Sequence, residues 1–483
     1  MKIEYNLTLD EILNCTGGKA VISGNGTGPL VFNEIFTDSR EDFSRNSIFI
    51  ALKGENFNGE DFVDTVFKNG GYCAAVSWDF LEKHDISAYP DKIIIAVEDA
   101  SDAFGKIAKF YLSKFDLNKK IAITGSCGKT TTKEMTFQMF SLKYGREKIL
   151  KNDYNYNNLI GVPKTIFKLN KNHDYLILEI GTNKKGEIKK LSEIITPDVG
   201  AITNIGKSHL LEFKDTEGVF EEKKELALSL EKDSFLIINA DDEILSAKYK
   251  NLSDNANILS FGFGKRKGIA PDVLCNRADI NGENGTTDIN VSFKGKNYFS
   301  NINFQGIHLI YDLLCALSIA LAGGIDIETS LKAMEGFVLP KGRMQVISNY
   351  ERGYILINDS YNSNPDSLKA ALDYLTANYR GKKKILVLGD MLELGESAET
   401  EHTEAGRYIG NTVDYIFYKG DYSDFLVNGL GEKGFAGKFF VIGDKNTFMD
   451  IFNKLDKKNS VILVKGSRGM KLEEYFEDEI RGK

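Results

Sequence analysis

The sequence predicts an α/β protein of three domains, and three observations support this fold class. The chain has 483 residues, which at roughly 150 residues per domain corresponds to about three domains. A short apolar strand, a glycine-rich turn and a helical stretch follow one another from Lys120, as at the start of a βαβ unit. Strand-like and helical segments alternate again after Gly336. We therefore expect domains over residues 1–117, 118–336 and 337–483.

Buried strands are predicted where short apolar runs end at polar or glycine-containing segments. These runs are residues 47–52, 74–77, 120–124, 175–180, 199–203, 354–357, 384–388 and 461–464, with further strands expected within 254–300 and a helix over 367–375. Polar clusters follow several of them, at residues 125–130, 179, 204–209, 359–364, 390 and 465–467. Because ligands collect at the carboxyl ends of parallel strands, two such domains facing each other predict a cleft.

Composition excludes several classes of protein. Apolar residues make up 42% of the chain and charged residues 27%, which is typical of a globular protein and not of a disordered one. The net charge is −8 and the basic residues are scattered, so we expect no nucleic-acid partner. The N-terminus lacks the apolar core of a signal peptide, and the longest apolar run, residues 313–325, is too short to span a bilayer.

The five cysteines are far apart and include no Cys-x-x-Cys pair. They therefore indicate neither a zinc site nor a disulfide framework. We expect a protein of the reducing cytoplasm that is not inserted in a membrane.

Residues 124–132, with the sequence Thr-Gly-Ser-Cys-Gly-Lys-Thr-Thr-Thr, form the strongest local signal. Glycines let the backbone wrap closely around phosphate oxygens, and the N–H groups of the following helix attract the same anion. Lys129 places a cation beside the terminal phosphates, and the Thr130 hydroxyl can ligate Mg²⁺. A glycine-rich turn without a ligand remains the alternative, because Ile123 stands where the general P-loop pattern has glycine. The residues expected to contact the nucleotide are Gly125, Ser126, Cys127, Gly128, Lys129, Thr130 and Thr131.

Three further residues are candidate metal ligands, each with a plainer alternative. Glu179 ends an apolar strand and can hold Mg²⁺ through oxygen, but it can also be a solvated carboxylate. His209 follows another buried strand, where a lone histidine is often structural. Lys223 lies in the helical stretch Glu-Glu-Lys-Lys-Glu, which by itself indicates a solvated charged face.

Taken in order, these segments resemble the Mur ligase family over nearly the whole chain. Residues 124–132 are similar to the family's ATP loop and residues 155–163 to its Asn-rich loop, with 179–181 and 204–209 at the expected places. Residues 342–344, 359–365, 388–395 and 465–470 resemble the branch of the family that adds a dipeptide. The resemblance implies a three-domain Mur ligase architecture, with a P-loop ATPase-like central domain and a Rossmann-like C-terminal domain.

The resemblance also implies an activity and its partners. These are ATP-dependent ligation of D-alanyl-D-alanine to UDP-MurNAc-tripeptide through an acyl phosphate, by a cytoplasmic monomer that uses two Mg²⁺ ions. Thr130 and Glu179 would hold one ion, and His209 together with a carbamylated Lys223 the other. Lys129, His209 and Lys223 are the catalytic residues that it implies.

The remaining implied roles concern the two substrates. Arg343 and Asp359 would reach the ATP from the C-terminal domain. His308 and Asp312 would lie at the adenine, although Leu309 and Asp312 stand where the family often has asparagine. For Ser39 and Arg40, near the UDP end of the substrate, a charged turn is the alternative. The residues expected to bind the substrates are Ser39, Arg40, Asn155, Asn157, Asn158, Asn362, Asn364, Lys465 and Ser467.

Three rival functions remain open from the sequence. One is another ligase of the same superfamily, such as the enzyme that adds the third residue or a folate polyglutamylating enzyme. Another is a P-loop nucleotide switch with slow hydrolysis. The third is a kinase, which would leave a stable phosphorylated product.

Overall fold

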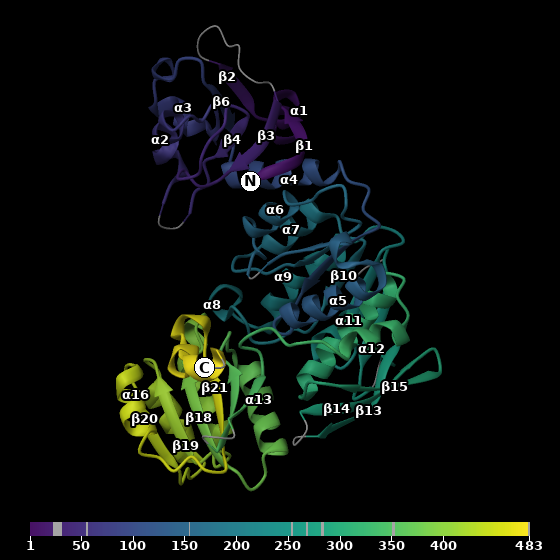
Figure 1. The fold of residues 1–483 in the computed structure, drawn as a ribbon, viewed down its shortest axis with the longest axis vertical. Helices are drawn as coiled ribbons and strands as arrows, with labels where there is room; N and C mark the ends of the chain where they lie inside the picture. Colours follow the sequence, from purple (N-terminus) through teal and green to yellow (C-terminus); the bar gives the residue numbers. More distant parts are fainter. Residues whose placement is uncertain are drawn as a thin grey trace.

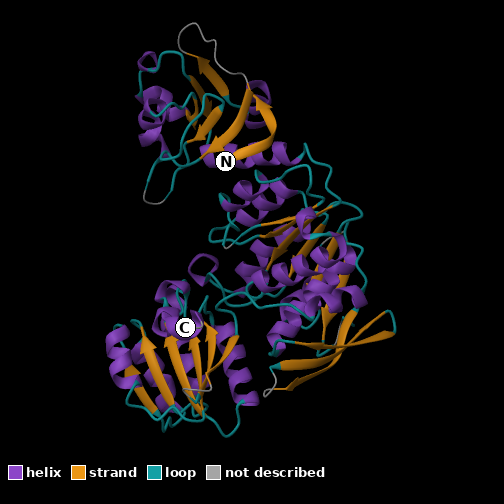
Figure 2. Ribbon diagram, viewed as in Figure 1, coloured by secondary structure: helices purple, strands orange, loops and turns teal. Residues whose placement is uncertain are grey.

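Three β-sheets follow one another along the chain and in space, each covered by helices (Figures 1 and 2). The structure is a computed structural model that describes residues 1–22, 31–54, 57–153, 155–252, 255–266, 269–281, 285–349 and 353–481. The N-terminal sheet lies at one end of the molecule in Figure 1, and the central and C-terminal sheets lie beyond it. The predicted three-domain α/β architecture is therefore confirmed, whereas the boundaries at 117 and 336 stay predictions.

The N-terminal sheet has six strands in the order β1-β3-β4-β5-β6-β2. Its three inner pairs are parallel, and the outer strands β1 and β2 pair antiparallel to them. Its elements are β1 (Lys2–Thr8), α1 (Leu9–Thr16), β2 (Lys19–Ile22), β3 (Val31–Phe36), β4 (Ser47–Ile50), α2 (Val63–Lys68), β5 (Cys73–Ser77), α3 (Trp78–Lys83), β6 (Ile93–Val97) and α4 (Ala100–Leu112).

The central sheet has nine strands in the order β15-β14-β13-β12-β11-β10-β7-β9-β8. From β13 to β8 in this order, β7 included, neighbouring strands pair in parallel, and β14 and β15 add an antiparallel extension. Its strands are β7 (Lys119–Thr124), β8 (Ile149–Lys151), β9 (Tyr175–Glu179), β10 (Val199–Ile202), β11 (Phe235–Asn239), β12 (Asn257–Gly262), β13 (Val273–Asn281), β14 (Thr286–Phe293) and β15 (Lys296–Ile302). Strands were thus correctly expected within residues 254–300, although 254, 267–268 and 282–284 lie outside the described residues.

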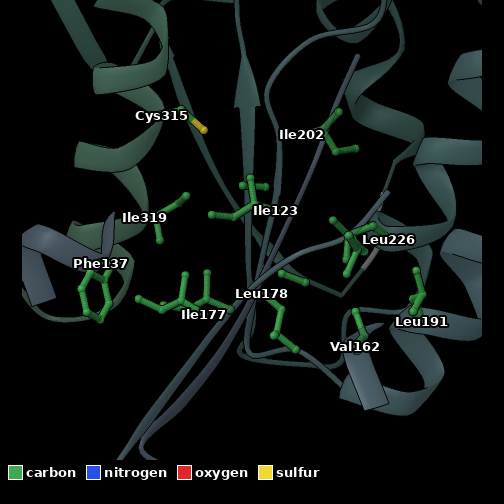
Figure 3. Close-up of a cluster of buried hydrophobic side chains, with 14 of the residues drawn as sticks. Ile123, Phe137, Val162, Ile177, Leu178, Leu191, Ile202, Leu226, Cys315 and Ile319 are labelled. Atoms are coloured by element: carbon green, nitrogen blue, oxygen red, sulfur yellow. The ribbon is translucent and has the colours of Figure 1, made fainter. Parts of the chain in front are cut away.

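Helices cover both faces of the parallel part of this sheet. Figure 3 shows Phe137 of α5 with Cys315 and Ile319 of α11 on one side of the strand residues, and Leu191 and Leu226 on the other. Because both faces are buried, these strands are almost wholly apolar, as parallel strands usually are. The helices are α5 (Lys129–Tyr144), α6 (Gly161–Ile166), α7 (Glu187–Ile195), α8 (Leu210–Phe213), α9 (Thr216–Leu228), α10 (Glu243–Lys248), α11 (Ile307–Ala322) and α12 (Ile327–Met334).

The C-terminal sheet has six strands in the order β16-β17-β21-β18-β19-β20, parallel except for the edge strand β16. Asn364 caps α13, and Pro365 occupies the first helical position, where its missing N–H is not needed. The elements are β16 (Gln345–Asn349), β17 (Tyr354–Asp359), α13 (Pro365–Asn378), β18 (Lys383–Gly389), α14 (Ala398–Ile409), β19 (Tyr415–Lys419), α15 (Ser423–Glu432), β20 (Lys438–Val441), α16 (Lys445–Phe452), β21 (Ser460–Lys465) and α17 (Glu477–Arg481).

Every strand predicted individually coincides with an observed strand to within two residues, and the predicted helix lies inside α13. Ile123, the residue that breaks the general P-loop pattern, is a fully buried residue of β7. The apolar run at 313–325 belongs mostly to α11. In the part of the chain that is described, no helix combines the length and the apolarity needed to cross a membrane.

Candidate active site

A cleft of about 960 Å³ lies between the central and C-terminal sheets. Its walls come from the carboxyl ends of β7, β9 and β10 on one side and of β17 and β21 on the other. The predicted meeting of polar clusters from two α/β domains is therefore observed. Asp390 is the exception, because it is buried behind the cleft, where its carboxylate accepts hydrogen bonds from the Tyr418 hydroxyl and the Asp421 N–H.

Two glycines with positive φ angles shape the phosphate-binding loop, residues 125–130. Gly125 has a φ of +151°, and a Cβ there would lie 1.8 Å from Thr203 Oγ1. Gly128 has a φ of +83° and precedes α5 as its N-cap. The loop is held by Asn204, whose carbonyl accepts from the Ser126 N–H and whose Oδ1 accepts from the Cys127 N–H at 2.9 Å. Asn204 thus shapes the loop, a role that its place in the predicted 204–209 cluster did not reveal.

Lys129 begins α5, whose first N–H groups have no carbonyl to bond within the helix. Its Nζ donates to Gly125 O at 2.7 Å and to Ser126 O at 3.4 Å, so the ammonium folds back over the loop. Burial lowers the pKa of this lysine. The loop therefore combines free helix N–H groups with one preorganised cation, which suits a phosphate group.

Thr130 and Glu179 lie side by side, as the sequence predicted. The Thr130 hydroxyl donates to Glu179 Oε2 at 2.7 Å, and Asn157 Nδ2 donates to Oε1 at 2.9 Å. Burial of Glu179 raises its pKa, but the positive charges of Lys129, Lys133 and Arg343 lower the pKa by more. The net pKa of Glu179 therefore lies below its usual value. The carboxylate is thus ionised beside a hydroxyl oxygen, and both are oxygen ligands of the kind that Mg²⁺ binds.

Two residues that sequence reasoning missed hold Glu179 in place. The Asn152 side chain accepts from the Glu179 N–H at 3.0 Å and donates to the Glu179 carbonyl at 2.8 Å. Lys133, only 1% exposed, donates from Nζ to the Asn152 carbonyl at 2.7 Å. Lys133 follows Lys129 by one helical turn, and that spacing was the available signal.

His209 faces the C-terminal domain. Its Nδ1 lies 2.7 Å from Oε2 of Glu393, and the Leu211 N–H donates to the Glu393 carbonyl. Nearby, the Lys207 N–H donates to Asp366 Oδ2 at 2.8 Å, and Lys207 Nζ lies 2.5 Å from Glu401. These acidic partners were not predicted, because nothing in a single segment indicates which residues of another domain it will meet.

Lys223 is only 1% exposed on α9, so the solvated helix face considered for it is wrong. Burial, followed by the neighbouring charge of Lys129, lowers its pKa to about 7. In the described part of the chain, Lys223 is not in the wall of the cleft. No three His, Cys, Asp or Glu side chains among the described residues cluster as a metal site. The best oxygen donor pair remains Thr130 with Glu179.

Arg343 connects the two domains across the cleft. Its Nη2 donates to Thr130 Oγ1 at 2.8 Å, and its guanidinium lies 4.2 Å from the ring centre of Tyr361. Its Nε is buried and finds no hydrogen-bond partner among the described residues. Asp359 accepts from Lys465 Nζ at 2.6 Å and from the Met344 N–H at 3.1 Å, while Lys465 also donates to the Asn362 carbonyl.

The other predicted residues divide between the cleft and the rest of the surface. Asn364 Nδ2 contacts Cys127 Sγ at 3.2 Å, and Ser467 Oγ accepts from the Leu392 N–H at 2.8 Å. Asn158 Oδ1 accepts from the Gly161 N–H at 2.8 Å, and Asn155 is exposed at the cleft.

Of the remaining predicted residues, one pair lines the cleft and another pair lies in the N-terminal domain. His308 and Asp312 of α11 line the cleft, and burial lowers the pKa of His308 to about 4 and raises the pKa of Asp312 to about 8. Ser39 and Arg40 follow β3 in the N-terminal domain and are not in the wall of this cleft. Arg40, 86% exposed, pairs with Asp38 at 2.6 Å, and that pairing is what a charged turn would show.

Comparisons with known proteins agree with this geometry. The family description "Mur ligase middle domain" matches residues 123–320, and "Mur ligase, glutamate ligase domain" matches residues 342–468. The chain is 34% identical to the UDP-N-acetylmuramoyl-tripeptide–D-alanyl-D-alanine ligase of Bacillus subtilis (strain 168), over 93% of each chain. It is also 34% identical to the enzyme of that name from Rickettsia prowazekii (strain Madrid E), over 92% of this chain and 94% of that one.

Solved structures show the same fold over the full length. The crystal structure of MurF from Acinetobacter baumannii aligns with a TM-score of 0.85 and 27% identity, covering 100% of both chains. MurF ligase from Thermotoga maritima, solved in complex with ADP, aligns with a TM-score of 0.80 over 93% of this chain and 98% of that one. At 24% identity the latter shows the fold alone.

Proposed function

The chain belongs to the Mur ligase family, and we infer that it catalyses the reaction named for its relatives, joining D-alanyl-D-alanine to UDP-MurNAc-tripeptide with ATP. The product is the pentapeptide precursor of peptidoglycan. The single observation that carries this conclusion is the cleft in which the phosphate-binding loop meets Arg343 and Asp359 of the facing domain.

Amide formation requires activation of the tripeptide carboxylate, because a carboxylate is a poor electrophile. ATP supplies that activation by transferring its γ-phosphoryl group to the carboxylate, and the amine of the dipeptide then displaces phosphate from the acyl phosphate. Lys129 and the N–H groups of α5 neutralise the negative charge that gathers on the transferring group. Arg343, whose buried Nε has no hydrogen-bond partner among the described residues, supplies a second cation from the opposite wall.

The residues at the loop also fit a magnesium ion. Thr130 and Glu179 present a hydroxyl and an ionised carboxylate on one side of the loop, 2.7 Å apart. Mg²⁺ held by Thr130 and Glu179 would offset the negative charge of the phosphate groups during transfer. Asn157 donates to the carboxylate, Asn152 holds the backbone of Glu179, and Lys133 donates to the Asn152 carbonyl in turn.

A second ion is proposed at His209 and a carbamylated Lys223. A lysine forms a carbamate only as the neutral amine, and a pKa of about 7 leaves much of Lys223 neutral at physiological pH. The carbamate would convert a buried cation into a carboxylate-like ligand. His209 would have to exchange its contact with Glu393 for the metal, or share it.

The N-terminal domain is proposed to hold the UDP end of the substrate, with Ser39 and Arg40 among its contacts. Asn155, Asn157 and Asn158 would guide the peptide toward the cleft, and Asn362, Asn364, Lys465 and Ser467 would form the opposite wall. His308 and Asp312 would lie near the adenine. We propose that the protein is a cytoplasmic monomer. The nucleotide substrate is available in the cytoplasm, and a single chain supplies the complete cleft.

Phosphate release tests this function and separates its rivals. With Mg-ATP and UDP-MurNAc-tripeptide, release should depend on added D-alanyl-D-alanine and should remain low when single amino acids replace it. Release without any acceptor would indicate a nucleotide switch, and a stable phosphorylated product would indicate a kinase. Release that follows a single amino acid and not the dipeptide would identify a different ligase of the superfamily.

A further inference from the structure

A carboxyl group is buried directly against the phosphate-binding loop. Asp312 is 7% exposed on α11, between the fully buried Ile310 and Leu313. A Cβ built on Gly128 would lie 2.0 Å from Asp312 Oδ1, so this oxygen fills the space that a side chain would take at that loop position. Asp312 also lines the cleft.

The surroundings of Asp312 do not compensate a negative charge well. In the described part of the chain, no basic nitrogen lies within the 4.0 Å that defines an ion pair with its carboxyl group. The charged or titratable groups that face it are Arg343, from the loop before β16, and Cys315, on α11 itself. From α5 it meets the Thr131 hydroxyl, which does not titrate. Burial outweighs Arg343 and Thr131 and raises the pKa of Asp312 to about 8.

The loop beside this carboxyl group is suited to an anion, since it combines the Lys129 ammonium with the free N–H groups at the start of α5. An ionised Asp312 would set a negative charge against Gly128, where a triphosphate has to approach. A protonated carboxylic acid carries no charge and can both donate and accept a hydrogen bond. The two forms therefore differ in their compatibility with a bound nucleotide.

We propose that Asp312 holds a proton in the nucleotide-bound protein and serves the site as a neutral hydrogen-bonding group, while its ionised form opposes phosphate binding. This inference rests on the proposed binding of Mg-ATP. The proton is taken from solvent onto a carboxyl oxygen, and no other bond forms or breaks.

The sign of the pH dependence follows from linkage. Below about pH 8 the acid is already protonated, so nucleotide affinity does not depend on it. Above that pH, binding must take up a proton, and Kd should rise by up to about tenfold per pH unit. Burial also lowers the pKa of Lys129 in the same loop, so the contribution of Asp312 has to be isolated by comparison with a variant.

The experiment measures binding of a non-hydrolysable Mg-ATP analogue by calorimetry from about pH 6.5 to about pH 9.5. It compares the full-length protein with Asp312→Asn, which keeps the shape and removes the titration. Asp79→Asn is the matched control, because it removes one exposed aspartate from the N-terminal domain. The ratio of the Kd of the unaltered protein to that of Asp312→Asn should be constant below about pH 8 and rise above it, by up to about tenfold per unit.

The number of protons taken up on nucleotide binding is read from the dependence of the binding heat on buffer ionisation. Near pH 8.5 the unaltered protein should take up more protons than Asp312→Asn, by up to about one. A ratio that stays constant across the whole pH range overturns the inference. If Asp312→Asn does not fold, Asp312→Ser gives the same ratio, because it is also uncharged and is smaller. If the unaltered protein binds no nucleotide at neutral pH, the proposed function itself fails, which is a different result.

Discussion

Replacing Lys129 with methionine removes the cation of the phosphate-binding loop and keeps most of its apolar stem. In the structure Lys129 is half-buried and its ammonium is held 2.7 Å from the Gly125 carbonyl, so it needs little reorganisation to meet a phosphate. A contact of about 4 Å at an effective dielectric near 20 corresponds to about 4 kcal/mol before desolvation. Loss of one preorganised donor at a reacting centre costs about 2.7–4 kcal/mol, or about 10²- to 10³-fold in rate.

We therefore expect kcat/KM to fall by about 10²-fold or more, measured as D-alanyl-D-alanine-dependent phosphate release. Lys143→Met is the matched control, because Lys143 is exposed in the last turn of the same helix. Its activity should stay within about twofold of the unaltered enzyme, as surface substitutions usually do. A Lys129→Met enzyme with nearly normal kcat/KM would refute the role assigned to the loop.

Three further predictions follow from the walls of the cleft. Glu179→Gln should raise the Mg²⁺ concentration needed for half-maximal nucleotide binding by about tenfold, because an ionised oxygen ligand becomes neutral; an unchanged requirement would place the ion elsewhere. Lys223→Ala should lose activity and regain part of it with short carboxylates, while Lys224→Ala should keep its activity. With ¹³C-bicarbonate, a carbamate NMR signal from the unaltered protein should grow as pH rises through about 7, because the Lys223 amine then loses its proton. Full activity without rescue would remove the carbamate. Arg343→Lys should cost about 1.5–3 kcal/mol in kcat/KM, or about 10- to 150-fold, because lysine cannot keep the bond to Thr130 and also serve a phosphate; a loss under threefold would argue against it.

Strand positions and residues of both walls of the cleft were accessible from sequence for a common physical reason. A parallel strand buried on both faces must be apolar along its length, so its polar end is conspicuous. Glu179 at the end of β9 and Lys465 at the end of β21 were found in this way. Parallel pairing then brings such ends to one edge of the sheet, which is why Thr130 and Glu179 are hydrogen-bonded although 49 residues separate them.

Residues that support the site through backbone contacts left weaker signals. Asn152 holds the Glu179 backbone from the end of a short edge strand, and only the one-turn spacing from Lys129 distinguishes Lys133 from other helix lysines. Lys223 likewise looks from sequence like part of a solvated helix face, although it is buried in the structure. Burial of a charged side chain depends on the packing of several elements, and composition near the residue does not encode it.

Contacts between domains were the least predictable part of the site, and they determine how its two halves meet. The segment after β10 presents Lys207, His209 and Leu211 to Asp366, Glu393 and Glu401. Asp366 lies in α13, Glu401 in α14 and Glu393 between β18 and α14, so no local pattern relates them. Arg343 and Thr130 meet across the same two domains, with Arg343 Nη2 donating to Thr130 Oγ1 at 2.8 Å. These contacts between the two walls of the cleft are therefore recognised only once both sheets are in place.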